Sequence, residues 1–189
     1  MKGAMTENIL EVKDLKKQYH GKNGTVDAVK EISFHVELGE IFGFLGANGA
    51  GKSTTINMVM TQLLLSGGQI LIDGKDLTGD VAAIRRRIDV VAKHNNPGRN
   101  LTAEENLYFH GRCFSMDSKT IAQRSEELLK RFGLYDRLNG YVKNFSGGMA
   151  QRLKIARAML HNPEILFLDS RRRDWIPTTA IFSGIGCSR

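Results

Sequence analysis

Apolar and polar residues alternate through the first part of the chain. Residues 9–19 and 26–36 alternate roughly, with Val, Ile and Phe at the apolar positions, which predicts two strands joined by the polar turn 21–24. Residues 41–45 form a short, unbroken apolar run, a pattern typical of a fully buried parallel strand. The segment 54–62 that follows is predicted to be a helix.

Strands and helices alternate in the later part of the chain. Residues 69–74 predict a strand that ends in a turn, 81–88 a short basic helix, and 89–92 another buried strand. After a further helix over residues 147–161, residues 164–169 predict an apolar strand that ends in an acidic residue.

A helical section lies between these two parts, over about residues 100–141. It contains a capping box, in which Thr102 caps a helix and Glu105 follows three residues later. Four apolar residues then fall on one face of a charged helix, namely Ile121, Leu128, Leu129 and Phe132. The pattern predicts an α/β core with a helical subdomain, and no internal repeat or low-complexity segment interrupts it.

The loop between the apolar run 41–45 and the next helix is rich in glycine. It fits the pattern G-x-x-x-x-G-K-[ST] in full, as Gly46-Ala47-Asn48-Gly49-Ala50-Gly51-Lys52-Ser53. Glycines let the backbone curl so that successive N–H groups point at phosphate oxygens, and the helix N-terminus adds positive potential. The Lys52 ammonium group suits the β- and γ-phosphates, and the Ser53 hydroxyl, with Thr54 close behind, can ligate magnesium. The loop therefore predicts a site for a nucleoside triphosphate with Mg²⁺.

Asp169 supplies the second half of this predicted site. It follows the apolar strand residues 165–168, where a carboxylate can hold magnesium, usually through water, opposite the Ser53 hydroxyl. An aspartate after a strand is often only a turn residue, but its pairing with a complete phosphate loop favours metal support. We therefore predict that Lys52 and Asp169 are catalytic residues and that Ser53 and Asp169 hold the metal.

Composition and charge exclude some classes of function. The chain has 189 residues, 41% of them hydrophobic and 25% charged, which is ordinary for one globular domain. No apolar run approaches a membrane span and residues 1–11 do not resemble a secretion signal, so we expect a cytoplasmic location. The two cysteines, Cys113 and Cys187, have no metal or redox spacing. Residues 170–189 carry +3 of the net charge of +7, and the rest is diffuse, so we expect no specific nucleic-acid partner.

A second glycine motif precedes the strand that ends in Asp169. The run 144–152, N-F-S-G-G-M-A-Q-R, and most of residues 8–169 resemble the ATP-binding subunits of ABC transporters, whose L-S-G-G-Q signature often varies to F-S-G-G-M. Ser146, predicted to cap the helix, and the amides of Gly147 and Gly148 form a second anion site at a helix N-terminus. The resemblance implies that this site meets the γ-phosphate of ATP held by a second ATP-binding subunit, in a head-to-tail dimer.

The resemblance also implies partners and a place in the cell. Members of the family bind ATP and Mg²⁺ and drive a separate membrane permease, so we expect a peripheral subunit on the inner face of the membrane. Tyr19 matches the aromatic residue that stacks on adenine in the family. The F-S-G-G-M form, Thr54-Thr55 and the run 100–107 most resemble the branch that exports drugs, antibiotics or sodium.

Residues 65–69 spell L-S-G-G-Q literally, but we predict no such role for them. They lead into a strand at 69–72 rather than into a helix, so no helix dipole would point at a phosphate there. At this place the family has a turn and a strand ending in D-G, like Asp73-Gly74 in this chain.

Two positions depart from the family pattern. Lys93 takes the place of a glutamine that can ligate magnesium and orient water, whereas an ammonium group cannot ligate a cation. Ser170 takes the place of the glutamate that polarises the attacking water, and the family run L-D-E-P-T-x-G-L-D-P does not continue. The family's switch histidine and last strands would lie beyond Arg189, so we expect the C-terminal part of the core to be missing.

A one-base frameshift would explain the residues that follow Asp169. Codons allowed for residues 169–177, with one G inserted before the serine codon, encode D-E-P-T-T-G-L-D-P in the shifted frame. The letters L-D are forced, because Trp175 between Asp174 and Ile176 gives them whatever codons are used. The other letters are only permitted, so sequencing the gene tests the hypothesis. The alternative is a solvated charged segment, or a patch like a nuclear-localisation signal.

The predicted fold is α/β, a P-loop NTPase core with an N-terminal antiparallel β region and a helical subdomain. The ABC-type ATP-binding domain is expected over residues 1–169, followed by a tail outside the family pattern over 170–189. The function predicted is that of an ATPase subunit of an exporter. Two alternatives stay open, a nucleotide-binding fragment that does not hydrolyse ATP and a DNA-repair or translation ATPase. The short helical insert, without a long coiled coil or zinc cysteines, counts against the repair forms.

Overall fold

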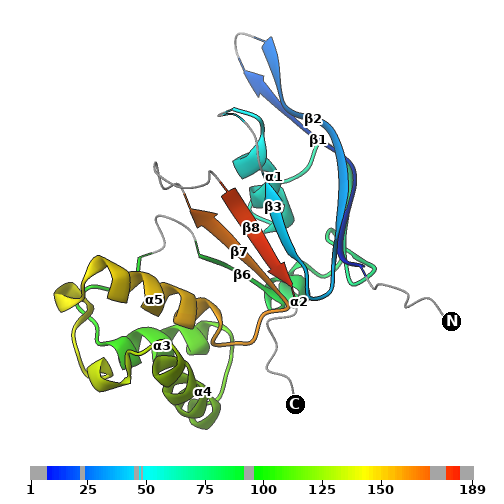
Figure 1. Ribbon diagram of the computed structural model, residues 1–189. Helices are drawn as coiled ribbons and strands as arrows, with labels where there is room; N and C mark the ends of the chain where they lie inside the picture. Colours follow the sequence, from blue (N-terminus) through cyan, green and yellow to red (C-terminus); the bar gives the residue numbers. More distant parts are fainter. Residues whose placement is uncertain are drawn as a thin grey trace, which may run out of the picture.

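A long antiparallel hairpin opens the described part of the chain (Figure 1). β1 (Asn8–Gly21) pairs with β2 (Gly24–Glu37), which confirms the two strands and the turn expected from the alternation. β4 (Gly67–Ile72) and β5 (Lys75–Asp76) extend this sheet in the order β2-β1-β4-β5. The computed structural model describes residues 8–21, 24–44, 47, 49–91, 96–170 and 178–183.

The second sheet has the order β3-β8-β7-β6, from β3 (Ile41–Phe44), β8 (Thr178–Ser183), β7 (Ile165–Ser170) and β6 (Ile88–Val91). β6 and β7 pair in parallel, as expected of two strands separated by a helical section. β8 pairs antiparallel with both β7 and β3. No strand was predicted over residues 178–183, so β8 is an addition that the sequence analysis missed.

The prediction of a fully buried parallel strand at residues 41–45 is wrong in two respects. Among the described strands, β3 pairs with β8 alone, and the pairing is antiparallel. β3 also lies at the end of the strand order of this sheet, and Ile41 is 67% exposed. Apolar runs predict burial on both faces only for strands inside a covered sheet. The inner side of β3 still packs, because Phe42 and Phe44 have ring centroids 5.2 and 5.0 Å from that of Phe34 on β2.

The two helices near the strands are shorter than predicted. α1 covers Lys52–Val59 rather than reaching residue 62, and Thr61 beyond it has a left-handed φ of 57°. α2 covers Val81–Arg85 rather than reaching residue 88. Asp80 is its N-cap, and the Asp80 side chain accepts a hydrogen bond from the Ala83 N–H.

Three longer helices form the helical part beside the second sheet (Figure 1), α3 (Ala103–Cys113), α4 (Ser118–Arg131) and α5 (Gly147–Ala158). Two single 3-10 turns, η1 (Tyr135–Arg137) and η2 (Val142–Asn144), lie between α4 and α5. The predicted capping box at Thr102 is confirmed, with reciprocal hydrogen bonds to Glu105 of 3.1 and 2.8 Å. α5 ends three residues before the predicted residue 161.

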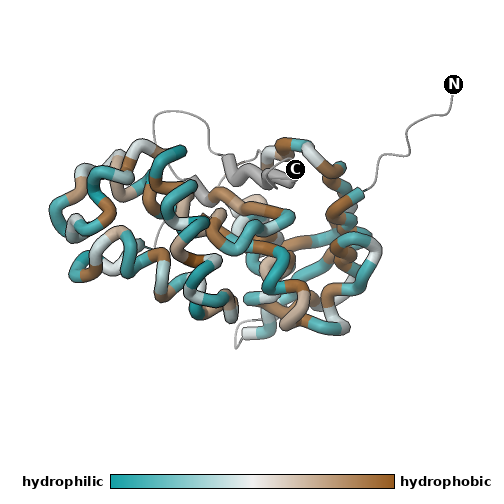
Figure 2. Tube along the Cα trace, turned by 90° about the horizontal axis from the view of Figure 1, so that it is seen from below, coloured by the Kyte–Doolittle hydropathy of each residue, from teal (hydrophilic) through white to brown (hydrophobic). Residues whose placement is uncertain are grey.

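Two hydrophobic cores meet at β6 and β7. Ile165 and Phe167 of β7 belong to the core beneath the strands and α1, whereas Leu166 between them belongs to the core of the helical part. Successive side chains of a strand point to opposite faces, so β7 is covered by a core on each face. The predicted helical face is confirmed in this second core, because Ile121, Leu128 and Leu129 are buried and Phe132 packs against them. Figure 2 shows apolar and polar residues interleaved along these helices.

One arginine ties the two sheets together. The Arg87 guanidinium donates hydrogen bonds to both Glu164 oxygens, one of them at 2.7 Å, and to Asp73 Oδ2 at 2.9 Å. Asp73 follows β4 and Glu164 precedes β7, so the network joins the turn of the first sheet to the start of a strand in the second. No helix within the described residues is long and apolar enough to cross a membrane.

Candidate nucleotide-binding site

Helix α1 starts where the predicted phosphate loop ends. Its first residue is Lys52, and Gly51 before it has a left-handed φ of 80°. Among the described residues no side chain caps this end of the helix, and the first turn contains no acidic residue. The first N–H groups of a helix have no partner inside the helix, so the start of α1 offers donors and positive potential to an anion.

Two glycines of the loop are required by the backbone. Gly49 and Gly51 have φ values of 85° and 80°, a conformation that L side chains rarely adopt. A Cβ at Gly51 would also lie 2.6 Å from the Ala28 carbonyl oxygen on β2. The sequence analysis predicted that these glycines let the loop curl around a phosphate group. The structure adds that Gly51 lets the loop lie directly against the hairpin.

The side chains that follow Gly51 divide between the surface and the core. Lys52 Nζ donates a hydrogen bond of 2.7 Å to the Ala47 carbonyl oxygen, so its side chain folds back over the loop. Ser53 is exposed and Thr54 is half-buried. The buried Thr55 hydroxyl donates to the Gly51 carbonyl oxygen at 3.0 Å. Thr55 was not predicted as a site residue. Its hydrogen bond to Gly51 stabilises the start of α1.

The predicted signature residues form the exposed start of α5. Ser146 is the N-cap, and its Oγ accepts a hydrogen bond of 3.2 Å from the Met149 N–H, which confirms the predicted cap. Ser146, Gly147 and Gly148 are all exposed. A Cβ built on Gly147 or Gly148 would meet no described atom within 4 Å. The approach to this helix N-terminus is therefore open over its two glycines.

Tyr19 lies on β1, and the residue is 43% exposed. The Lys17 ammonium nitrogen is 5.1 Å from the centroid of this ring, a cation–π contact. The exposed ring offers a surface on which a base can stack. The phosphate loop leads into α1 beside the hairpin, whereas the signature starts α5 in the helical part (Figure 1).

Some predicted residues fall outside what the structure describes. Gly46, Asn48 and Lys93 lie in undescribed segments. Asp169 and Ser170 are described through their backbone only, as the last two residues of β7, in register with Thr179 and Thr178 of β8. The proposed roles of these side chains therefore rest on the sequence.

The literal L-S-G-G-Q at residues 65–69 leads into a strand, as predicted, because β4 begins at Gly67. Gly68 has a φ of 82°, and a Cβ there would lie 2.5 Å from the Lys13 carbonyl oxygen on β1. The motif therefore serves the close approach of two strands, where only glycine fits.

We expect Gly68→Ala to destabilise the fold by about 2–3 kcal/mol, because alanine is strained at positive φ and its methyl group clashes with backbone. Gly67→Ala is the matched control, since its Cβ would meet only Lys16 side-chain carbons at 3.6 Å or more. Urea unfolding of both variants measures the difference. Equal midpoints for the two variants would show that β1 and β4 do not approach as described.

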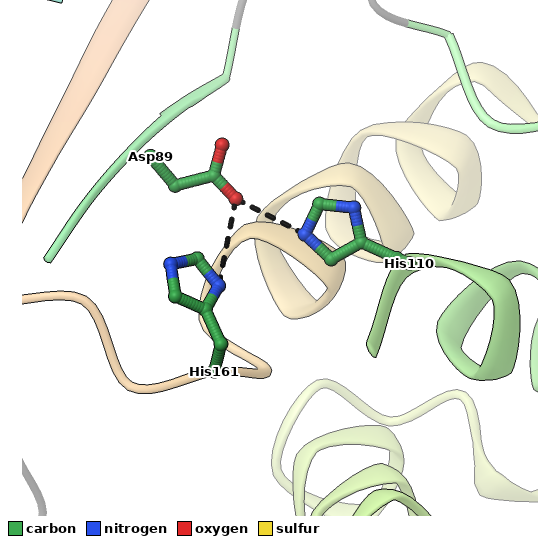
Figure 3. Close-up of side chains that lie close together, drawn as sticks. All are labelled: Asp89, His110 and His161. Atoms are coloured by element: carbon green, nitrogen blue, oxygen red, sulfur yellow. Dashed lines mark hydrogen bonds and ion pairs between the residues drawn. The ribbon is translucent and has the colours of Figure 1, made fainter. Parts of the chain in front are cut away.

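One polar group has no counterpart among the predicted site residues. Asp89, His110 and His161 gather where β6, α3 and the segment after α5 meet (Figure 3). No spacing motif joins these three residues in the sequence, so only the fold could reveal the group. The elements that carry this group are not those that carry the phosphate loop, which precedes α1.

The fold and the phosphate loop together define a P-loop nucleotide-binding protein of the α/β class. A model of the ABC transporter family matches residues 29–171. The ABC transporter ATP-binding protein NatA of Bacillus subtilis is 38% identical over 169 residues, which cover 89% of this chain and 66% of NatA. The daunorubicin/doxorubicin resistance ATP-binding protein DrrA of Streptomyces peucetius is 38% identical over 172 residues, covering 91% of this chain and 49% of DrrA.

Solved structures agree with the sequence comparisons. CbiO1 from Clostridium perfringens, described as part of the ABC transporter complex cbiONQ, superposes with a TM-score of 0.72 at 27% identity, covering 86% of this chain and 65% of that one. The chain thus spans between about half and two thirds of the length of these relatives. It belongs to the ABC transporter family, as an ATP-binding domain, and the predicted P-loop NTPase fold with its antiparallel β region and helices is confirmed.

Proposed function

We propose that this chain binds ATP with Mg²⁺ at the phosphate loop and the start of α1. The observation that carries the proposal is the uncapped N-terminus of α1 directly after Gly51, with Lys52 as its first residue. An anion fits this place because backbone donors, helix dipole and an ammonium group converge there. The phosphate-binding residues are Gly46, Ala47, Asn48, Gly49, Ala50, Gly51, Lys52, Ser53 and Thr54.

Two further residues complete the proposed nucleotide site. Tyr19 stacks on the adenine ring, for which its exposed position is suitable. The Ser53 hydroxyl and the Asp169 carboxylate hold Mg²⁺, which neutralises phosphate charge when it is bound. The exposed Ser53 at the start of α1 supports its part in this pair.

The start of α5 is proposed to complete the ATP site of a second ATP-binding subunit, in a head-to-tail dimer. Ser146, Gly147 and Gly148 provide a hydroxyl and two amides at an exposed helix N-terminus. α1 lies beside the hairpin and α5 in the helical part (Figure 1), which suits a site assembled from two copies rather than one. The second copy can be this chain or a paired ATP-binding subunit.

The larger assembly proposed is a transporter with a separate membrane permease, on which this chain sits as a peripheral subunit at the cytoplasmic face. Resemblance to the drug, antibiotic and sodium branch favours export, and the similarity to DrrA supports that branch. The ATP-binding domain is proposed to cover residues 1–169, with its helical subdomain at about 100–141. We propose no nucleic-acid partner.

In this chain, the residues for binding ATP and those for hydrolysing it differ in how well they match the family. Lys52 and the phosphate loop support binding, whereas Ser170 cannot act as the general base that a glutamate provides. Ser170 thus favours the function of a subunit that binds ATP but hydrolyses it weakly or not at all.

Equilibrium titration of the purified chain with a fluorescent ATP analogue and Mg²⁺ tests the proposed binding. One nucleotide per chain, competed by ATP, is the expected result. No saturable binding at millimolar nucleotide would refute the proposal. Stimulation of turnover by DNA or ribosomes would favour the nucleic-acid alternative instead.

Gly148→Ala tests the proposed dimer. Since a methyl group at residue 148 has open space in the single chain, the variant should keep its stability and its nucleotide affinity. In the dimer the methyl group would stand between the amides and the phosphate, so we expect dimerisation on Mg²⁺-ATP to weaken at least about 10-fold. Light scattering after size exclusion measures this. Dimers of wild type and variant that form equally well would contradict the assigned role of Gly148.

A further inference from the structure

Asp89 of β6, His110 of α3 and His161, three residues beyond the end of α5, face one another (Figure 3). Asp89 Oδ2 is 3.1 Å from His110 Nε2 and 3.8 Å from His161 Nδ1. One ligand atom of each residue lies within 4.8 Å of those of the other two. The three side chains are 4–16% exposed, so the group is enclosed between the second sheet and the helical part.

His161 is the least satisfied member of the group. Its side chain is 4% exposed, and neither ring nitrogen has a hydrogen-bond partner within the described part of the chain. Its ring stacks on that of Phe114 at a centroid distance of 3.7 Å. Burial lowers the pKa of His161 to about 4, although the Asp89 carboxylate opposes that shift. Imidazole binds a metal ion through a ring nitrogen, so a buried histidine whose ring nitrogens make no side-chain hydrogen bond in the described part of the chain is suited to be a ligand.

We propose that Asp89, His110 and His161 form a site for one divalent transition-metal ion of the zinc type. Two imidazoles and one carboxylate are a ligand set that such ions take in proteins. Tetrahedral coordination at about 2.0–2.1 Å places neighbouring ligand atoms about 3.3 Å apart. The observed 3.1 and 3.8 Å from Asp89 Oδ2 to the two imidazoles lie on either side of that separation, and all three ligand atoms lie within 4.8 Å of one another.

The carboxylate is already oriented for this task. The Val90 N–H donates a hydrogen bond of 2.6 Å to Asp89 Oδ1, which leaves Oδ2 directed at the two imidazoles. Arg124 donates to the carbonyl oxygens of Leu160 and Met159 at 3.1 and 3.0 Å, which fixes the segment that carries His161. Such outer contacts hold metal ligands in place. With three protein ligands, the fourth position is left for water.

Two positive groups act against the metal ion. The Arg157 guanidinium interacts electrostatically with Asp89, and Arg124 does so with His161. Both repel a divalent cation, so we expect weaker binding than at a structural site made of thiolates. Since the ligands come from β6, α3 and the segment after α5, a bound ion would join the second sheet to the helical part and stabilise their contact.

The proposal is tested on the full chain without nucleotide, by competing Zn²⁺ against a chromophoric chelator and by thermal unfolding. We expect one Zn²⁺ per chain, and at 100 times the dissociation constant a rise in melting temperature of about 5–10 °C. X-ray absorption at the zinc edge should show only nitrogen and oxygen neighbours at about 2.0–2.1 Å. Absence of binding at about 100 µM Zn²⁺, or a sulfur neighbour, would overturn the proposal.

Asp89→Asn and His110→Gln should each weaken Zn²⁺ binding at least about 10-fold, in the range typical for the loss of a ligand or its support. His35→Gln, at an exposed histidine of β2, and Cys113→Ser, at the exposed thiol of α3, are the matched controls and should bind as wild type does. Circular dichroism verifies that each variant is folded. If a ligand variant does not fold, the absorption spectrum of the wild type decides, because imidazole rings give a distinct outer-shell signal. Unchanged binding in folded ligand variants, or lost binding in a control, would refute the assigned site.

Discussion

Lys52→Ala is expected to weaken Mg²⁺-ATP binding by about 30- to 100-fold. Charge-assisted hydrogen bonds are worth about 1.5–3 kcal/mol each, and the Lys52 ammonium group is proposed to make such bonds to the β- and γ-phosphates. Lys52 Nζ bonds to the Ala47 carbonyl oxygen at 2.7 Å, a partner that it can exchange for phosphate because both lie at the loop. Isothermal titration of wild type and variant measures the ratio of dissociation constants.

A matched lysine separates this effect from a general loss of charge. Lys75 on β5 is exposed, and Lys75→Ala removes one positive charge, as Lys52→Ala does. It should leave ATP affinity within a factor of about 2. Both variants should unfold within about 0.5 kcal/mol of wild type, since neither lysine is buried in a core. Equal loss of affinity in the two variants would mean that the phosphates lie elsewhere.

Local signals made the strands and helix starts predictable. The alternation of β1 and β2, the capping box at Thr102 and the cap at Ser146 are decided within a few residues, and the structure has all of them. Helix ends were less accurate, because α1 ends at Val59 without a residue that marks a stop, and α5 ends at Ala158, before the stop that Asn162-Pro163 marks in the sequence. The phosphate loop was found for the same reason as the caps, since its chemistry is written in consecutive residues.

What the sequence did not predict depends on contacts between distant residues. The burial of β3 depends on which strands lie beside it, and the apolar run alone contained no information about β8. β8 itself lies in the part outside the family pattern, where no resemblance could suggest a strand. Asp89 and His161 are 72 positions apart and come from a strand and a turn, so their approach is a property of the fold.

Ser170→Glu is expected to raise ATP turnover by about 10²-fold or more. A positioned general base contributes about 10²–10⁴-fold to such reactions, and a serine hydroxyl cannot accept a proton as a carboxylate does. Residue 170 ends β7, directly after Asp169, so a carboxylate at this place would stand next to the proposed metal-holding residue. Phosphate release by wild type and variant, at equal nucleotide occupancy, measures the gain.

Ser170→Gln provides the control for this gain, because its amide is similar in size to glutamate but cannot take a proton. We expect it to remain as slow as wild type while binding ATP equally well. The same comparison should be made with residues 170–177 replaced by the run E-P-T-T-G-L-D-P, which the codons allowed for these residues permit in the shifted reading frame. Turnover restored only by that replacement would place the defect in the whole segment rather than in the single base. Wild-type turnover that Lys52→Ala abolishes would instead show that this chain hydrolyses ATP without a glutamate at residue 170.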